Sequence, residues 1–169
     1  YKRQVRNAIK KNFNKDYFFN IKKDNLNDFE KIYVSPGISL RQKKFKRKKI
    51  SKKVNRDLNL YISNLTNQKI VAITGTNGKT TTTNLIYNIL KNAGLSVGIA
   101  GNVGDSFSKM LLSGDKDIYV LEISSFQLDD IKDFKPNISV ITNVLEDHLD
   151  RYDFNFSKYI DAKMKIISN

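Results

Sequence analysis

The sequence contains no cysteine, which excludes disulfide bonds and thiolate metal sites. It has no apolar run approaching the roughly 20 residues that a membrane-spanning helix needs, and no signal-peptide pattern opens it. Its 169 residues begin with Tyr1 rather than Met, and this length allows one ordinary domain, or one domain and a piece of another. We therefore expect a fragment, cut at both ends, of a longer protein, and no membrane span within these 169 residues.

Acidic residues are scarce in the first third of the chain. Residues 1–60 carry 19 Lys/Arg and 5 Asp/Glu, whereas residues 61–169 carry 11 and 12, so the net charge of +13 belongs to the N-terminal part. The positive charge peaks in the run 41–49, where it could neutralise nucleic-acid phosphates. We favour a solvated surface, because the run contains a single aromatic residue, Phe45, and no stacking platform or base-reading motif accompanies it.

The glycine loop over residues 75–80, Gly-Thr-Asn-Gly-Lys-Thr, is the most informative segment. It follows an apolar run and precedes a helical pattern, and a loop in that position cradles a phosphate chain. Lys79 can reach the β- and γ-phosphate oxygens, and the Thr80 hydroxyl can bind Mg²⁺. The usual P-loop pattern has a glycine where this chain has Ile73, so the loop is a shortened variant.

The remaining apolar patterns alternate between short strands and helices. Strands are predicted over residues 16–21, 31–34, 70–74, 95–100, 117–123 and 138–142, and helices over 25–29, 57–65, 81–92, 106–112 and 156–167. This order predicts an α/β fold: a mostly parallel, P-loop-type central sheet, preceded by the tail of a Rossmann-like domain. Its site would lie at the carboxyl ends of the strands.

Two burial predictions follow from the same patterns. Strands 117–123 and 138–142 are unbroken enough to be buried on both faces of a parallel sheet. The helix over 81–92 is expected to bury four apolar side chains, those of Leu85, Ile86, Ile89 and Leu90.

Three further side chains are candidates for chemistry. Glu122 ends a buried strand and could hold Mg²⁺ beside the glycine loop, although a Glu there could instead cap the next helix. His148 is the only histidine in the chain. It lies in an acid-rich loop after strand 138–142, at the same sheet edge, so we prefer a functional role to a structural one. Lys163, on the last helix, is by its position alone a solvated charge.

Together these motifs resemble the Mur ligase family, the ATP-dependent amino-acid ligases of peptidoglycan synthesis. The short loop over 75–80 is similar to that family's ATP motif. Three segments resemble the branch that adds D-glutamate to UDP-N-acetylmuramoyl-L-alanine, namely residues 101–104 (GNVG), 121–128 (LEISSFQL) and 146–152 (EDHLDRY). The branch that adds diaminopimelate or lysine usually has a histidine in place of Phe126. The resemblance covers roughly residues 31–169.

The resemblance implies a domain plan and a set of ligand contacts. Residues 1–66 would form part of an N-terminal UDP-substrate-binding domain, and residues 67–169 a truncated central ATP-binding domain. Gly37 would lie near the UDP group, and the muramoyl substrate would contact Asn102, Ser124 and Gln127. ATP would be bound by Gly75, Thr76, Asn77, Gly78, Lys79, Thr80 and Thr81.

The resemblance also implies a catalytic set with two Mg²⁺ ions. Thr80 matches a ligand of the first ion, and Glu122 and His148 match ligands of the second. Lys163 matches a lysine that becomes carbamylated and so acts as a carboxylate-like metal ligand. The catalytic residues would be Lys79, Glu122, His148 and Lys163.

The implied reaction passes the γ-phosphoryl group of ATP to the L-alanine carboxylate, and the amine of D-glutamate then attacks the acyl phosphate. We expect a cytoplasmic monomer, and we expect this fragment to bind ligands without turnover, because the family's uridine-binding loop and C-terminal domain would lie outside it. Two alternatives stay open. One is a sister ligase of the Mur or folylpolyglutamate type, and the other is a nucleic-acid-binding ATPase that uses the run 41–49.

Overall fold

The computed structural model describes residues 26–35, 38, 40, 45, 48–110, 112, 114–129, 131 and 133–167. The predicted strand over 16–21, the predicted substrate residue Gly37 and most of the basic run 41–49 lie outside these residues.

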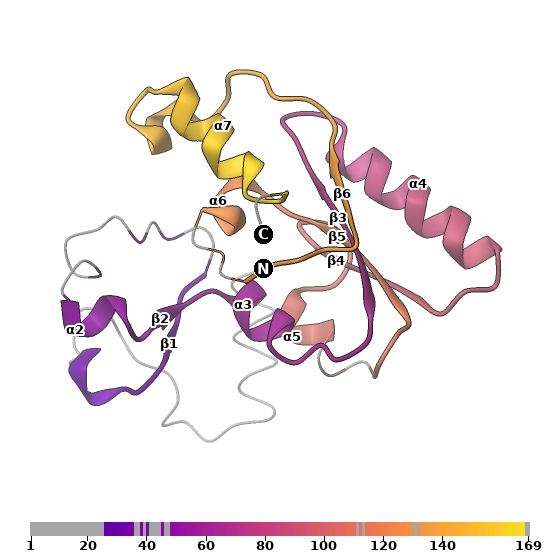
Figure 1. Cartoon of the computed structure of the whole chain (residues 1–169), viewed down its shortest axis with the longest axis horizontal. Helices are drawn as coiled ribbons and strands as arrows, with labels where there is room; N and C mark the ends of the chain where they lie inside the picture. Colours follow the sequence, from indigo (N-terminus) through magenta and orange to yellow (C-terminus); the bar gives the residue numbers. More distant parts are fainter. Residues whose placement is uncertain are drawn as a thin grey trace.

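A four-stranded parallel sheet forms the centre of the molecule (Figure 1). Its order is β4-β5-β3-β6, with bounds β3 (Lys69–Thr74), β4 (Val97–Gly101), β5 (Ile118–Glu122) and β6 (Ile138–Ile141). Ile73 of β3 pairs with Glu122 of β5 on one side and with Val140 of β6 on the other. The carboxyl ends of these three strands therefore meet at one edge, and the predicted parallel α/β sheet is confirmed.

The two faces of β3 pack into different cores, because side chains alternate along a strand. Ile70 and Ala72 join a cluster that includes residues of α3 (Asp57–Ile62) and α5 (Phe107–Met110). Val71 and Ile73 pack on the other face, against α4 (Lys79–Asn92). The continuous apolar run before the glycine loop is thus a strand buried on both faces.

Helix α4 buries a different stripe from the one predicted. Ile86 and Leu90 pack against the sheet, but Leu85 and Ile89 are each 58% exposed, so the prediction was wrong for these two. The stripe facing the core consists of residues 83, 86, 87 and 90, which have the i, i+3, i+4, i+7 spacing of one helix face. Its first member is the fully buried Thr83, and a polar residue there hides the true stripe from an apolar pattern.

Strand β6 is less buried than predicted. Ile138 is 55% exposed, and the other three residues of the strand are half-buried. Within the described residues β6 pairs only with β3 and is an edge strand, so the prediction of burial on both faces was wrong for it. Strand β5 lies between β4 and β3 and is buried as predicted.

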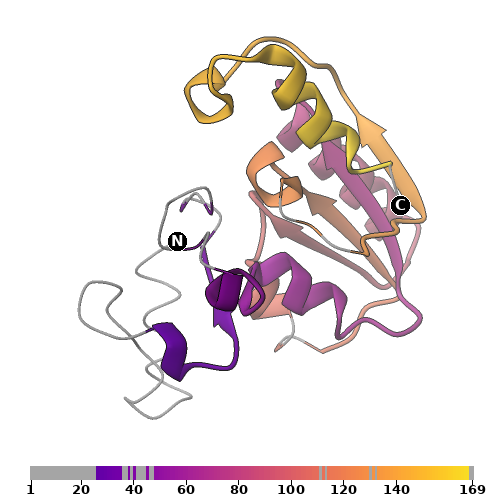
Figure 2. The ribbon, with the colours of Figure 1, turned by 60° about the vertical axis from the view of Figure 1, so that its left-hand side comes forward.

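A smaller unit precedes the central sheet. It contains η2 (Leu26–Asp28) and two parallel strands, β1 (Ile32–Tyr33) and β2 (Val54–Asn55), with α2 (Lys48–Ser51) between them in the chain. The unit lies to one side of the central sheet in Figures 1 and 2 and has its own apolar cluster. Parallel strands joined through a helix are what the tail of a doubly wound domain should show. Helix α3, which precedes residue 66, packs in the core of the central sheet. The predicted domain boundary at residue 66 stays a prediction.

Three short elements complete the described part: α6 (Ser125–Leu128), η3 (Leu149–Tyr152) and α7 (Phe156–Met164). They pack together through a cluster of buried and half-buried side chains that centres on Tyr152, Tyr159 and Ala162. Among the described helices, none is long and apolar enough to cross a membrane.

Candidate functional site

The loop between β3 and α4 has the backbone that a phosphate site needs. Gly75 has φ 149°, and a Cβ atom there would lie 1.9 Å from Thr142 Oγ1, so a side chain is excluded. Gly78 adopts the left-handed conformation immediately before α4. The N–H of Thr82 donates to the Gly78 carbonyl at 3.0 Å, so the N–H groups of residues 78–81 precede the helical ladder. Such groups at a helix start attract anions.

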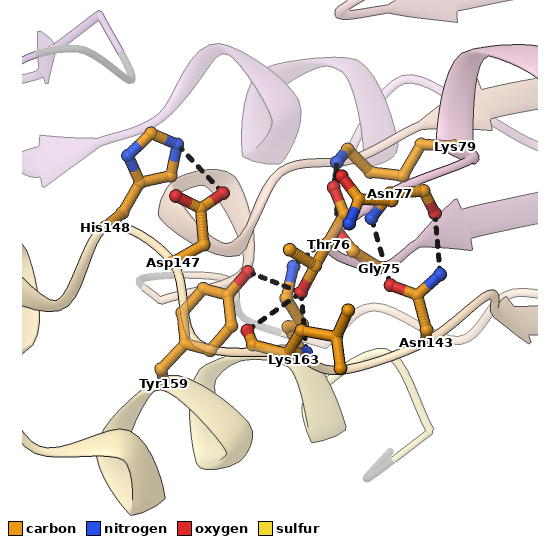
Figure 3. Close-up of polar contacts among 10 residues, drawn as sticks. Gly75, Thr76, Asn77, Lys79, Asn143, Asp147, His148, Tyr159 and Lys163 are labelled. Atoms are coloured by element: carbon orange, nitrogen blue, oxygen red, sulfur yellow. Dashed lines mark hydrogen bonds and ion pairs between the residues drawn. The ribbon is translucent and has the colours of Figure 1, made fainter.

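Residues after β6 hold this loop in place (Figure 3). The Asn77 N–H donates to Asn143 Oδ1 at 3.0 Å, and Asn143 Nδ2 donates back to the Asn77 carbonyl at 3.0 Å. Thr142 Oγ1 donates to the same carbonyl at 2.6 Å, and the Thr76 N–H donates to the Asn143 carbonyl at 3.0 Å. Sequence reasoning missed Asn143, although its place directly after a strand at the carboxyl edge was the available signal.

Two lysines converge on the loop. Lys79 Nζ donates to the carbonyls of Gly75 at 2.9 Å and Thr76 at 2.7 Å, and Lys163 Nζ donates to the Gly75 carbonyl at 2.7 Å. Lys163 is 2% exposed, so the interpretation of a solvated charge was wrong. Burial above all, and then the Lys79 cation, lower the pKa of Lys163 from 10.5 to about 8, against the opposite effect of the Asp147 carboxylate. The two lysines therefore form a compact positive centre at the loop.

Glu122 lies beside the start of α4. It is 3% exposed, and its Oε2 accepts a hydrogen bond from Thr80 Oγ1 at 2.8 Å. The alternative of a helix-capping Glu does not hold, because Ser124 caps α6. A carboxylate next to a hydroxyl is a pair of hard oxygen ligands, which suits Mg²⁺.

Three of the predicted substrate residues lie at the carboxyl end of β5, and the fourth, Gly37, lies outside the described residues. The N–H of Asn102 donates to the Glu122 carbonyl at 3.1 Å, so the loop after β4 lies against the end of β5. Ser124 and Gln127 form a capping box, in which the Ser124 N–H donates to Gln127 Oε1 at 2.8 Å. These contacts are internal to the protein, and the substrate roles of the three residues stay predictions.

His148 lies in the loop after β6 and is largely exposed. Its side chain is 57% exposed, its Nε2 lies 3.5 Å from Asp147 Oδ2, and its ring centroid lies 5.2 Å from that of Phe126. Within the described ranges, no three His, Cys, Asp or Glu side chains lie close enough together to hold a metal ion. The metal-ligand role of His148 therefore stays a prediction.

Sequence reasoning also missed Arg56, which has no motif around it. The side chain is 1% exposed, and its Nη1 donates to the carbonyls of Ser35 and Ile38, each at 2.9 Å. It therefore fixes the segment that flanks the predicted substrate residue Gly37.

Comparison with known proteins agrees with this geometry. The Mur ligase middle domain family matches residues 73–169. A UDP-N-acetylmuramoylalanine–D-glutamate ligase of Bacteroides thetaiotaomicron is 52% identical over 104 residues, which cover 62% of this chain and 23% of the relative. The protein of that name in Rickettsia bellii is 40% identical over 162 residues, which cover 95% of this chain and 35% of the relative. The chain thus spans about a quarter to a third of the length of these curated relatives.

Solved structures share the fold. The MurF ligase of Thermotoga maritima in complex with ADP matches with a TM-score of 0.51 and 21% identity, over 89% of this chain and 42% of that one. The UDP-N-acetylmuramate–alanine ligase MurC of the same organism matches with a TM-score of 0.51 and 22% identity, over 90% and 34%. With a family match over more than half of its residues, the chain belongs to the Mur ligase family.

Proposed function

We propose that the full-length protein is an ATP-dependent ligase that joins D-glutamate to UDP-N-acetylmuramoyl-L-alanine. The observation that carries this proposal is the 52% identity over 104 residues to relatives named for that reaction. The site geometry supports it, because a glycine loop, two lysines and a buried carboxylate meet at one sheet edge.

The loop would bind the phosphates of ATP. The N–H groups at the start of α4 and the Lys79 ammonium would neutralise the phosphate charge, which lets an anionic carboxylate approach. The L-alanine carboxylate oxygen attacks the γ-phosphorus, and the bond to the β-phosphate oxygen breaks, releasing ADP. The amine of D-glutamate then attacks the acyl carbon, phosphate leaves, and the nitrogen loses its proton.

The residues present fit magnesium binding, with Thr80 as the proposed ligand of a first ion and Glu122 as a proposed ligand of a second. Their oxygens are 2.8 Å apart in a position next to the loop, and both are of the type that Mg²⁺ prefers. A bound cation would supply further neutralisation of phosphate charge. We infer that His148 is a further ligand of the second ion and that carbamylated Lys163 completes the set of metal ligands. A carbamate forms when a neutral amine attacks CO₂ and loses a proton, and burial of Lys163 favours the neutral amine.

The rest of the assignment follows the family plan. We infer that residues 67–169 belong to the central ATP-binding domain and residues 1–66 to an N-terminal domain that binds the UDP substrate. Gly37, Asn102, Ser124 and Gln127 would contact that substrate. We also propose a cytoplasmic monomer.

The test is release of ADP and phosphate by the full-length protein. We expect release to require both UDP-N-acetylmuramoyl-L-alanine and D-glutamate. Equal turnover with L-lysine or diaminopimelate on the dipeptide-extended nucleotide would move the assignment to a sister ligase.

A second measurement tests the loop directly. Lys79→Ala should abolish binding of ATP analogues in calorimetry, because it removes the loop's own cation from the β- and γ-phosphates. Binding as tight as the parent's would contradict the assignment of this loop to ATP.

A further inference from the structure

The hydroxyl of Thr76, in the middle of the glycine loop, has three polar neighbours (Figure 3). The Leu145 N–H lies 2.9 Å from Thr76 Oγ1, the Leu145 carbonyl oxygen lies 3.1 Å away, and the Tyr159 hydroxyl lies 3.0 Å away. Leu145 follows β6, and Tyr159 lies on α7, 83 residues along the chain from Thr76. One loop side chain is therefore tied to two other parts of the site.

The three contacts fix the direction of each hydrogen bond. Thr76 has one hydroxyl proton, and the Leu145 carbonyl can only accept, so all three contacts are hydrogen bonds only if Thr76 donates to that carbonyl. The Leu145 N–H and the Tyr159 hydroxyl then both donate to Thr76 Oγ1. Burial raises the pKa of Tyr159, which keeps its donor proton in place.

Tyr159 is itself held firmly. It is 1% exposed. Its ring packs edge-on against Tyr152, with ring centroids 5.4 Å apart, and stacks with Phe156, with ring centroids 6.2 Å apart. Lys163 lies one helical turn further along α7, with its Nζ 4.6 Å from the Tyr159 ring centroid. Through these two residues α7 contacts Gly75 and Thr76, two successive residues of the loop.

We propose that Tyr159 is a positioning residue for the nucleotide, which acts through Thr76 to hold the phosphate loop in its binding conformation. The inference rests on the proposed function in one respect, that the loop binds ATP. A loop already held by a rigid helix loses less conformational freedom when the phosphates arrive, so its affinity is higher. The bond between Tyr159 and Thr76 is made to a side chain of the phosphate loop itself, so we expect its loss to affect the nucleotide more than the amino-acid substrate.

The experiment compares Tyr159→Phe with the parent in the full-length protein. Calorimetry with AMP-PNP and Mg²⁺ should show affinity weakened by about threefold to tenfold, the size of one net hydrogen bond. Tyr152→Phe is the matched control, since it removes a hydroxyl from the same aromatic cluster but outside the Thr76 network, and its affinity should stay within about twofold of the parent's.

Substitutions at Thr76 test the same bond from the other side. Thr76→Val should lose at least as much affinity as Tyr159→Phe, because it also removes the two contacts with Leu145, and Thr76→Ser, which keeps the hydroxyl, should retain the affinity. The double variant Tyr159→Phe/Thr76→Val should bind AMP-PNP no more weakly than Thr76→Val alone, because Thr76→Val already removes the hydrogen bond to Tyr159.

Steady-state kinetics separate positioning from a merely structural role. Tyr159→Phe should raise KM for ATP and leave KM for D-glutamate and kcat within about twofold of the parent's. A uniform loss across all substrates, or additive losses in the double variant, would overturn the inference. Unchanged AMP-PNP affinity in Tyr159→Phe would overturn the inference about Tyr159 and leave the proposed function standing. Absence of nucleotide binding by the parent would overturn both.

Discussion

Two cations are buried in the described part of this protein, one in each region. Arg56 belongs to the small β1–β2 unit and is 1% exposed, and its Nη1 donates to the carbonyls of Val34, Ser35 and Ile38. Lys163 belongs to the central site and is 2% exposed, and its Nζ donates to the Gly75 carbonyl. Similar burial thus comes with very different hydrogen bonding.

The difference indicates different uses. A guanidinium stays protonated and offers five donors in a fixed plane, so Arg56 can tie several carbonyls together permanently. A lysine can give up its proton, and burial lowers the pKa of Lys163 to about 8. We therefore expect Arg56 to contribute to folding and Lys163 to contribute to chemistry.

The largest effect should come from Lys163. In the full-length enzyme, Lys163→Ala should lower kcat/KM on the order of 100-fold or more, because it removes the proposed carbamate from the site. Acetate or formate should restore part of the activity by supplying the missing carboxylate. Lys163→Arg cannot form a stable carbamate and should be no better than Lys163→Ala, so full activity in Lys163→Arg would sink the carbamate proposal.

Arg56 should show the opposite behaviour. Arg56→Leu leaves several carbonyls without their donor, and we expect it to lower the free energy of unfolding by about 2–3 kcal/mol in urea titrations. Arg56→Lys should recover only part of this loss, because one ammonium cannot reproduce the planar donor set. A cost below about 0.5 kcal/mol for Arg56→Leu, the range of ordinary surface changes, would remove the contrast between the two cations.

A smaller effect concerns pH. As pH falls from 10.5 to about 8, the unfolded chain binds a proton at Lys163 that the folded chain does not bind, so folding stability falls across this window. Below about pH 8, Lys163 is protonated in both the folded and the unfolded chain, and its contribution to folding stability no longer changes with pH. Lys163→Met should lack this change, whereas Arg56→Leu should keep it. The check is urea unfolding between pH 7 and pH 11 in CO₂-free buffer with EDTA; equal slopes in the parent and Lys163→Met would contradict it.

The smallest effect on stability is expected on the exposed side of α4, where a side chain contributes neither to folding, as we expect for Arg56, nor to chemistry, as we propose for Lys163. Ile89 lies on the exposed side of α4, and Ile89→Ala should change the free energy of unfolding by less than about 0.5 kcal/mol. Leu90→Ala, one residue further on, removes a side chain that packs against the sheet and should cost about 2 kcal/mol. Similar costs at both positions would show that the exposed stripe is covered in the full-length protein.

The sequence was sufficient for the central strands and for the glycine loop, because an apolar run and a fixed loop motif are local signals. It also placed Glu122 beside the loop, since carboxyl ends of parallel strands share an edge. It could not identify the stripe of α4, where the buried Thr83 carries no apolar signal. Nor could it pair Thr76 with Tyr159 or Arg56 with Ser35, because these contacts join distant residues and depend on tertiary packing.

The hydrogen bonds that Thr142 and Asn143 make to the backbone of Asn77 affect how long this asparagine stays chemically intact. Asparagine is a thermolabile residue, and Asn77 precedes Gly78, whose nitrogen meets little steric hindrance when it attacks the asparagine side chain. That cyclisation requires the backbone to rotate between the two residues. Asn143 holds both the N–H and the carbonyl of Asn77, and Thr142 holds the same carbonyl, so the rotation is restrained. The lifetime of an intact asparagine in this loop therefore depends on two side chains that follow a different strand.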